Sequence, residues 1–329
     1  MRLMKRLKIV FLSVLSLVLM FLSTQRTFLI SMTAANLFAL VCQANTYAPP
    51  KATDDEVKAS ATQPMNNTAF GQMNSVGGAL ESSIGRGGRT KGLQFHTPVL
   101  ASGLEYRSTH DTTLGGFTGN EYSGDIAVDA DIYDGLIAGV LYQHTHRGAW
   151  NAQDTSERLD ADGVSLYFGK RLFDCLNLGV SYNHGETEDR LTRSLNTNLD
   201  RTSDGYTLLA GVSNKHGKWN WATTLSFGYV NDDYDQQQTL QTGRFGWGGS
   251  LGYDITKQFT LGAAFTYYNY VFQDTFNNIA PRDDDYYDIG PRLSYYLNDR
   301  TTLKLDFDSQ QGYTDFGAYT LRASFDLAF

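Results

Sequence analysis

The sequence predicts an all-β fold, a 12-stranded antiparallel transmembrane β-barrel with a short N-terminal helix and linker. Three observations predict it: apolar and polar residues alternate repeatedly over residues 99–329, short and long connections interleave, and the chain ends on a bare aromatic residue. Successive side chains of a strand point to opposite faces, so a period of two indicates a sheet whose two faces meet different surroundings.

The last stretch, Tyr319 to Phe329, gives the clearest alternation. Its apolar face comprises Tyr319, Leu321, Ala323, Phe325, Leu327 and Phe329, and its other face comprises Thr320, Arg322, Ser324, Asp326 and Ala328. Alternation alone fits a soluble β-sandwich as well as a membrane barrel. The other strands and their connections must decide between these two folds.

Similar runs recur upstream, and together they predict twelve strands. The runs lie near residues 99–107, 122–132, 136–146, 163–172, 176–186, 205–213, 219–229, 245–255, 259–272, 286–297, 301–309 and 319–329. Aromatic residues gather toward the strand ends, as at Tyr122, Tyr142, Trp219 and Tyr253, which is typical of the girdles at membrane interfaces.

The connections favour the barrel. Short turns alternate with longer polar segments near 148–158, 187–202, 231–242 and 274–285. One rim of the sheet therefore has only short turns, and the other carries longer loops. Outer-membrane barrels have this asymmetry. A sheet within lipid must also close, because every backbone N–H and C=O there needs a partner.

Composition narrows the class further. The mean hydropathy of -0.33 excludes a bundle of membrane helices, but it suits a barrel with a polar lumen. The chain has 27 Lys+Arg against 35 Asp+Glu, and without residues 1–44 the balance is 22 against 35. A chain this acidic does not suit nucleic acid, whose phosphates require a basic surface.

Residues 1–44 read as a signal peptide. Arg2, Lys5, Arg6 and Lys8 precede two apolar runs, and Ala44 ends a small-residue cleavage site. The duplicated apolar run leaves three alternatives: an extended leader, a start further in near Met32 or just before Arg26, or an uncleaved anchor.

Residues 45–98 read as a polar linker with a candidate pore helix over 67–84. Helical spacing there places four apolar residues on one face, and these are Phe70, Met73, Leu80 and Ile84. Gly77 and Gly78 weaken the helix by about 1 kcal/mol each relative to Ala, so a flexible linker remains the alternative.

The polar faces of the strands predict charges inside the barrel. The candidate lumen charges are Arg171, Arg244, Arg292, Lys304, Arg322, Asp254, Asp288, Asp306 and Asp326. They suggest a charged, water-bearing lumen, but structural ion pairing along the barrel wall is the alternative that we favour.

The segment Asn120 to Thr145, NEYSGDIAVDADIYDGLIAGVLYQHT, resembles the strand-turn-strand pattern of autotransporter translocator domains. LYFGKRLFDCLNLGVSYNHGETE and WNWATTLSFGYVNDDYD are similar to later units of that domain, and the resemblance covers residues 99–329. It implies a twelve-stranded barrel with a helix through the pore, here Asn67 to Ile84, that accompanies export of an N-terminal passenger.

The C-terminal strand resembles the assembly signal of that family, and the matching residues are Tyr319, Leu321, Phe325, Leu327 and Phe329. We therefore expect a monomer in the outer membrane, with lipid, lipopolysaccharide, the barrel-assembly machinery and periplasmic chaperones as partners. Residues 45–98 leave little or no room for a passenger, so an anchoring or translocation-type pore is expected.

We expect no enzymatic activity, cofactor or metal. His144, His146 and His184 lie near Glu186, Glu188 and the run 283–285, but no motif gives them a nucleophile or a third metal ligand. The alternatives for function are a small-solute porin, a soluble periplasmic β-protein, and an adhesin that uses the loops 187–202 and 274–285.

Overall fold

The computed structural model describes residues 52–61, 68–86, 98–111, 116–133, 135–152, 154–173, 175–193, 196–235, 238–274, 285–312 and 316–329. Two helices precede the sheet, α3 (Asp54–Ala61) and α4 (Thr68–Arg86). The strands are β1 (Val99–Asp111), β2 (Phe117–Tyr133), β3 (Leu136–Asn151), β4 (Thr155–Leu172), β5 (Leu176–Arg193), β6 (Thr197–Asn198), β7 (Arg201–His216), β8 (Trp219–Tyr234), β9 (Thr239–Asp254), β10 (Phe259–Gln273), β11 (Asp285–Asn298), β12 (Thr301–Gln311) and β13 (Phe316–Ala328).

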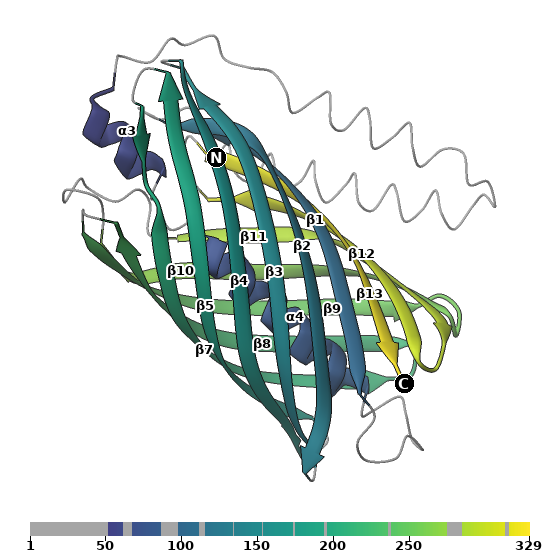
Figure 1. Cartoon of the computed structure of the whole chain (residues 1–329). Helices are drawn as coiled ribbons and strands as arrows, with labels where there is room; N and C mark the ends of the chain where they lie inside the picture. The colour runs from purple at the N-terminus through teal and green to yellow at the C-terminus, as the bar shows by residue number, and fades with distance from the viewer. Residues whose placement is uncertain are drawn as a thin grey trace, which may run out of the picture. The chain divides into compact units, whose positions relative to one another are not determined.

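The sheet closes on itself (Figure 1). Each long strand pairs antiparallel with the next, β4 pairs with β5, and β1 pairs with β13 from Val99 opposite Ala328 to Asp111 opposite Phe316. The two-residue β6 adds only a short pairing to β5. Over the described residues the fold is therefore a closed antiparallel barrel of twelve long strands, which confirms the predicted fold class.

The outer face of the barrel is an apolar band. Large side chains on it are exposed, among them Leu104, Val128, Leu166 and Leu208. On the terminal strand Leu321 and Phe329 are 44% and 59% exposed, whereas Asp326 and Ala328 are buried inside. The apolar register of that strand thus faces outward.

Aromatic pairs mark the two edges of this band. Toward one rim the rings of Tyr106 and Tyr122 lie 5.2 Å apart, and those of Tyr182 and Tyr206 lie 5.3 Å apart. Toward the other rim Trp219 and Tyr253 lie 4.9 Å apart. Such girdles are typical of strands that cross a bilayer.

We call the edge with the β2–β3, β4–β5, β7–β8, β9–β10 and β11–β12 connections the turn rim, and the opposite edge the loop rim. Tight turns at the turn rim need unusual backbone angles, and Gly135 and Gly217 supply them with φ of 72° and 59°. The two chain ends of the barrel, Val99 and Phe329, also lie at the turn rim.

The strands continue further toward the loop rim than the sequence predicts. The expected loops 148–158, 187–202 and 231–242 are mostly strand, so that only 152–154, 194–200 and 235–238 separate the strands there. Above the apolar band the outer face meets water and becomes polar, while the inner face mixes polar and apolar residues, so the alternation weakens. Strand-to-strand hydrogen bonds continue because they do not depend on that alternation.

The N-terminal region contains one helix that was predicted and one that was not. α4 covers the predicted 67–84 with a shift of one to two residues, which lies within the usual uncertainty of helix ends. α3 corrects the prediction for residues 54–61, which the sequence analysis gives as linker. The expected signal peptide, 1–44, lies outside the described residues. No helix in the described ranges is long and apolar enough to span a membrane.

The last residue is tied into the closing seam of the barrel. The Phe329 N–H donates to the carbonyl oxygen of Pro98 at 3.0 Å, and the Ala328 N–H donates to that of Arg300 at 2.9 Å. The C-terminus therefore holds β13 between its two neighbours, β1 and β12.

Changing Phe329→Ser should lower the yield of assembled barrel in cells several-fold, because it removes the terminal outward aromatic at the seam. The measurement compares unheated with boiled membrane extracts on a gel, in which a folded barrel migrates differently. Phe173→Ser is the matched control, since Phe173 is an 87% exposed aromatic on a turn. Equal yields of the two variants would contradict a special role for Phe329.

Candidate functional site: the occupied lumen

Helix α4 lies inside the barrel (Figure 1). Its N-terminal end is at the loop rim, where the Thr68 hydroxyl lies 3.4 Å from that of Thr187. Its later residue Leu80 lies near the turn-rim end of β5, beside Gly179. The helix therefore runs through the lumen from the loop rim toward the turn rim.

The predicted helix face is buried against the barrel wall. Phe70, Met73 and Leu80 are 3%, 3% and 2% exposed. The ring of Phe70 packs edge-on to Tyr270 at 6.2 Å. Ile84 falls within α4, but its side chain lies outside the described residues. The described members of the face therefore pack inside the lumen.

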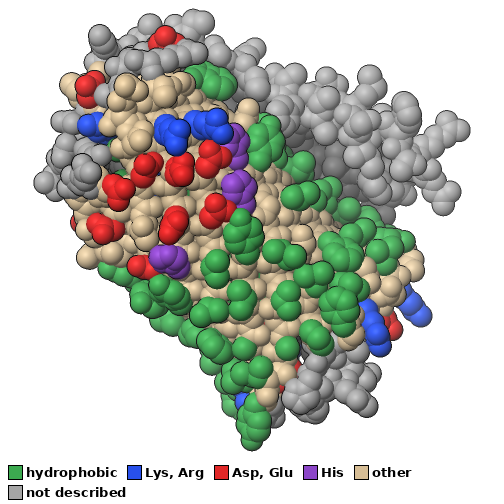
Figure 2. Space-filling view, viewed as in Figure 1, with side chains coloured by type: hydrophobic (Ala, Val, Ile, Leu, Met, Phe, Trp, Pro, Cys, Tyr) green, Lys and Arg blue, Asp and Glu red, His purple; other side chains and the backbone are tan. Residues whose placement is uncertain are grey.

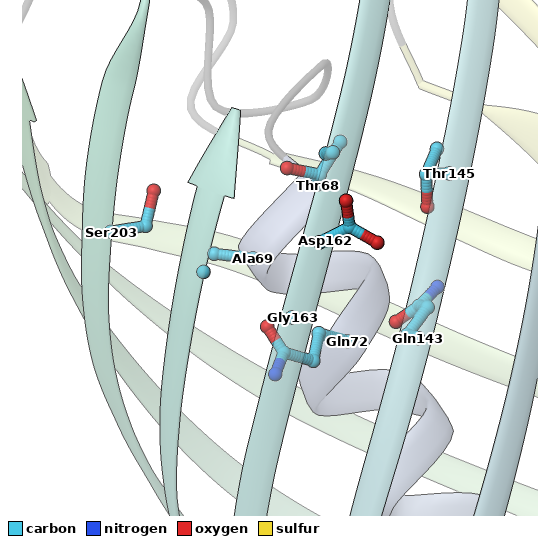
Figure 3. A pocket seen from close by; sticks show the side chains of 10 residues that line it. Thr68, Ala69, Gln72, Gln143, Thr145, Asp162, Gly163 and Ser203 are labelled. Carbon is cyan, nitrogen blue, oxygen red and sulfur yellow. The ribbon is translucent and has the colours of Figure 1, made fainter. Parts of the chain in front are cut away.

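A polar contact and two wall glycines hold α4 close to the barrel wall. Gln72 donates through Nε2 to Ser165 Oγ at 2.8 Å, beside a cavity of about 10 Å³ (Figure 3). A Cβ at Gly163 would lie 2.6 Å from Gln72, and one at Gly205 would lie 2.5 Å from Met73. Glycines in the wall therefore let the helix approach closely.

Arg244 on β9 holds the helix against a second part of the wall, four strands around the ring from β4. Its guanidinium carbon lies 4.3 Å from the ring centroids of both Phe70 and Tyr268, so it sits between a helix ring and a wall ring. It also donates to Asn74 Oδ1 at 2.8 Å and to the Tyr286 hydroxyl at 3.1 Å. Buried cation–π and hydrogen-bond contacts of this kind stabilise packing.

Arg322 joins the helix to the closing seam. From β13 it donates to Asp125 Oδ2 on β2 at 2.6 Å and to Ser75 Oγ on α4 at 3.1 Å. Its Nη1 also lies 3.5 Å from Glu105 Oε2 on β1. One side chain of β13 thus contacts the next two strands around the ring, β1 and β2, and the helix α4.

The other predicted lumen charges lie along the same interior. Lys304 pairs with Asp326 at 2.9 Å, and Arg292 lies 3.9 Å from Asp306. A cavity of about 670 Å³ beside α4 is lined by all the predicted lumen charges except Asp254. Asp254 lies at the turn rim, where it pairs with Lys215 and accepts hydrogen bonds from Asn220 and Thr260.

The cavity reaches the turn rim and, in the other direction, extends along α4 as far as Thr68. Its lining includes Lys215 and Asn220 beside the β7–β8 turn. Near the loop rim the interior also holds a buried charged layer that sequence reasoning missed, and none of its residues lines the cavity. The layer consists of Arg147, Glu157, Asp189, Arg201 and Asp232.

Pairing within the charged layer is incomplete. Arg147 pairs with Glu157, and Arg201 Nε lies 3.8 Å from Asp232 Oδ1. Neither carboxylate oxygen of Asp189 has a hydrogen-bond partner among the described residues. Burial, and next the nearby carboxylate of Glu157, raise the pKa of Asp189 well above its ordinary value.

Above the apolar band the outer surface carries histidine–carboxylate pairs. His144, His146 and His184 lie 3.0, 2.7 and 2.9 Å from Asp162, Asp160 and Asp204. These charged groups gather on the loop-rim side of the hydrophobic surface (Figure 2). The hydrogen bond from His146 lowers the pKa of Asp160. No group of three or more His, Cys, Asp or Glu in the described ranges is placed to hold a metal ion.

One of the missed features has a signal in the sequence and one does not. The contacts of Gln72, Asn74 and Ser75 have none, because their partners lie on strands far away in the sequence. For α3, Thr53 and Glu56 form a capping box: Glu56 N–H donates to Thr53 Oγ1 at 3.3 Å, and Thr53 N–H donates to Glu56 Oε2 at 2.7 Å.

No protein-family model matches the chain, and no curated protein sequence matches it. Solved structures do. The translocator domain of the autotransporter NalP from Neisseria meningitidis matches with a TM-score of 0.61 and 12% identity over 82% of this chain and 100% of that chain. The beta domain of the Bordetella autotransporter BrkA gives 0.59 and 11%, covering 72% of this chain and 100% of that chain.

An outer-membrane channel from Pseudomonas putida F1 gives a TM-score of 0.52 and 11% identity, covering 72% of this chain and 97% of that chain. At such identities the likeness establishes the fold alone. The fold is that of outer-membrane barrels, and its structural neighbours include autotransporter translocator domains and a channel.

Arg244→Ala should lower the free energy of unfolding by about 2–4 kcal/mol, because it removes two cation–π contacts and two buried hydrogen bonds. Urea unfolding in detergent micelles measures this. Arg190→Ala is the control, since the Arg190 side chain is 59% exposed and should change stability by less than about 0.5 kcal/mol. A double-mutant cycle with Phe70→Ala should show coupling; additive effects would contradict the clamp.

Asp189→Asn should raise the unfolding temperature at pH 8. The raised pKa means that the folded protein holds a proton that the unfolded chain releases near pH 4, so this group removes stability as pH rises from there toward its folded pKa. The gain should therefore shrink as the pH falls to 4 and below, where the unfolded chain also takes up the proton. Heating series analysed by gel mobility at several pH values measure it, with exposed Glu188→Gln as control. A loss of stability at pH 8 would contradict this assignment.

Proposed function

We propose that the protein is an outer-membrane barrel of the autotransporter translocator type, which anchors its own N-terminal segment and keeps its lumen closed without catalysing any reaction. The observation that carries this proposal is α4, a helix threaded through the lumen and bonded to two separate parts of the wall, β4 and β9, by Gln72 and Arg244. The turn rim then faces the periplasm, as in barrels of this architecture.

The direction of the helix supports an anchoring role. Because Thr68 lies at the loop rim, the segment before α4 emerges on the side that we assign to the cell exterior. The lumen charges serve as structural ion pairs and clamps, since Arg322 and Arg244 contact the helix directly.

The proposed partners follow from the chemistry of the outer surface. The apolar band meets lipid, and the histidine–carboxylate pairs above the band meet the lipopolysaccharide head groups. The outward strand with Tyr319, Leu321, Phe325, Leu327 and Phe329 is offered to the barrel-assembly machinery after transit with periplasmic chaperones. We propose a monomer that binds no nucleic acid.

A small-solute channel is the second candidate, and the cavity of about 670 Å³ that reaches the turn rim favours it. Conductance in planar bilayers separates the two. The wild type should be silent, and a variant lacking residues 62–92 that still shows the mobility shift of a folded barrel should conduct. Conductance by the wild type would support the channel, and a silent deletion variant would contradict the plug.

A further inference from the structure

α3 packs at the loop rim and is separate from α4 in the sequence and in its contacts. Val57 and Ala61, one helical turn apart, are 4% and 1% exposed. They pack into an apolar seat at the loop rim that is formed by Phe117, Ala149, Leu191, Leu199, Tyr234 and Leu240. Figure 1 shows α3 beside the loop-rim ends of the strands, separate from α4 in the lumen.

The seat is assembled from opposite walls of the barrel. Phe117 is on β2 and Leu240 is on β9, and in the closed strand order these two strands lie half a turn of the ring apart. Their side chains belong to one cluster with α3. A cluster that joins opposite walls must cross the mouth of the lumen.

The charged layer lies at the same end of the lumen. Arg147, Asp189 and Arg201 are 2%, 0% and 4% exposed although they lie at the mouth of a barrel, where water would otherwise reach them. Hydration of these charges favours an open mouth, and burial of the apolar seat favours a closed one. The two tendencies oppose each other, as a closure that can be reversed requires.

We propose that α3 is a lid that seals the loop rim independently of the α4 plug, so that the lumen has two closures in series. This inference rests on the proposed function, in which the lumen is kept closed. α3 spans only 8 residues, too few to form a stable helix alone in water. It therefore folds where the seat holds it and unfolds when it leaves, with the Thr53–Glu56 capping box fixing where it starts.

The test uses full-length chains in planar bilayers, each checked for the mobility shift of a folded barrel. One variant replaces residues 68–86 with a Gly/Ser segment of equal length and keeps α3, and a second adds Val57→Asp to it. The first should stay nearly silent and the second should conduct at least tenfold more, because a carboxylate at position 57 cannot stay in the apolar seat. Val57→Leu in place of Val57→Asp should stay closed.

A peptide with the sequence of residues 52–61 added on the loop-rim side should block the Val57→Asp variant, and the same peptide with Val57→Asp should not. Equal conductance of the two chain variants, whether both open or both closed, would overturn the lid. The proposed plug fails separately, through a silent variant lacking residues 62–92. In that variant only residues 93–98 join α3 to β1 at the turn rim, too few to reach the loop rim along a 13-residue strand, so the lid cannot close it.

Discussion

Closure of the sheet is the constraint on which the rest of this structure depends. Unpaired backbone groups are too costly within lipid, so β1 must find β13 across the whole chain. The seam does so over the full length of both strands, from Val99 opposite Ala328 to Asp111 opposite Phe316. The lumen, its charges and its plug exist because the strands form a ring.

The seam also connects the wall to the plug. Arg322 on the closing strand contacts β1, β2 and α4 together, and Arg244 holds α4 from β9. The helix is thus fastened at the point where the barrel closes and at β9, four strands further around the ring. Plug and wall stabilise each other, and the interior charges act first as structure.

The sequence predicts the parts of this fold that the membrane imposes. Lipid outside and a polar lumen inside require apolar and polar residues to alternate along each strand. The strands, the short turns and the outward face of Tyr319 to Phe329 can therefore be predicted from the sequence. Above the band the outer face is polar and the inner face mixes polar and apolar residues, so the strand ends near 148–158 and 187–202 read as loops. Arg244 was predicted as a lumen charge, but its contacts with Phe70 and Asn74 join residues far apart in sequence, so no local pattern reveals the clamp. α3 is missed because its apolar face is only Val57 and Ala61.

The central claim is that α4 occupies the lumen with its N-terminal end at the loop rim. A disulfide between Thr68→Cys and Thr187→Cys tests it most directly, because the two hydroxyl oxygens lie 3.4 Å apart, and Cys42 and Cys175 are changed to Ser in the same chain. The account predicts that oxidation of intact membranes links the pair in most molecules, while Thr68→Cys with Thr301→Cys at the turn rim stays unlinked. Absence of the 68–187 link in folded barrels would contradict the account.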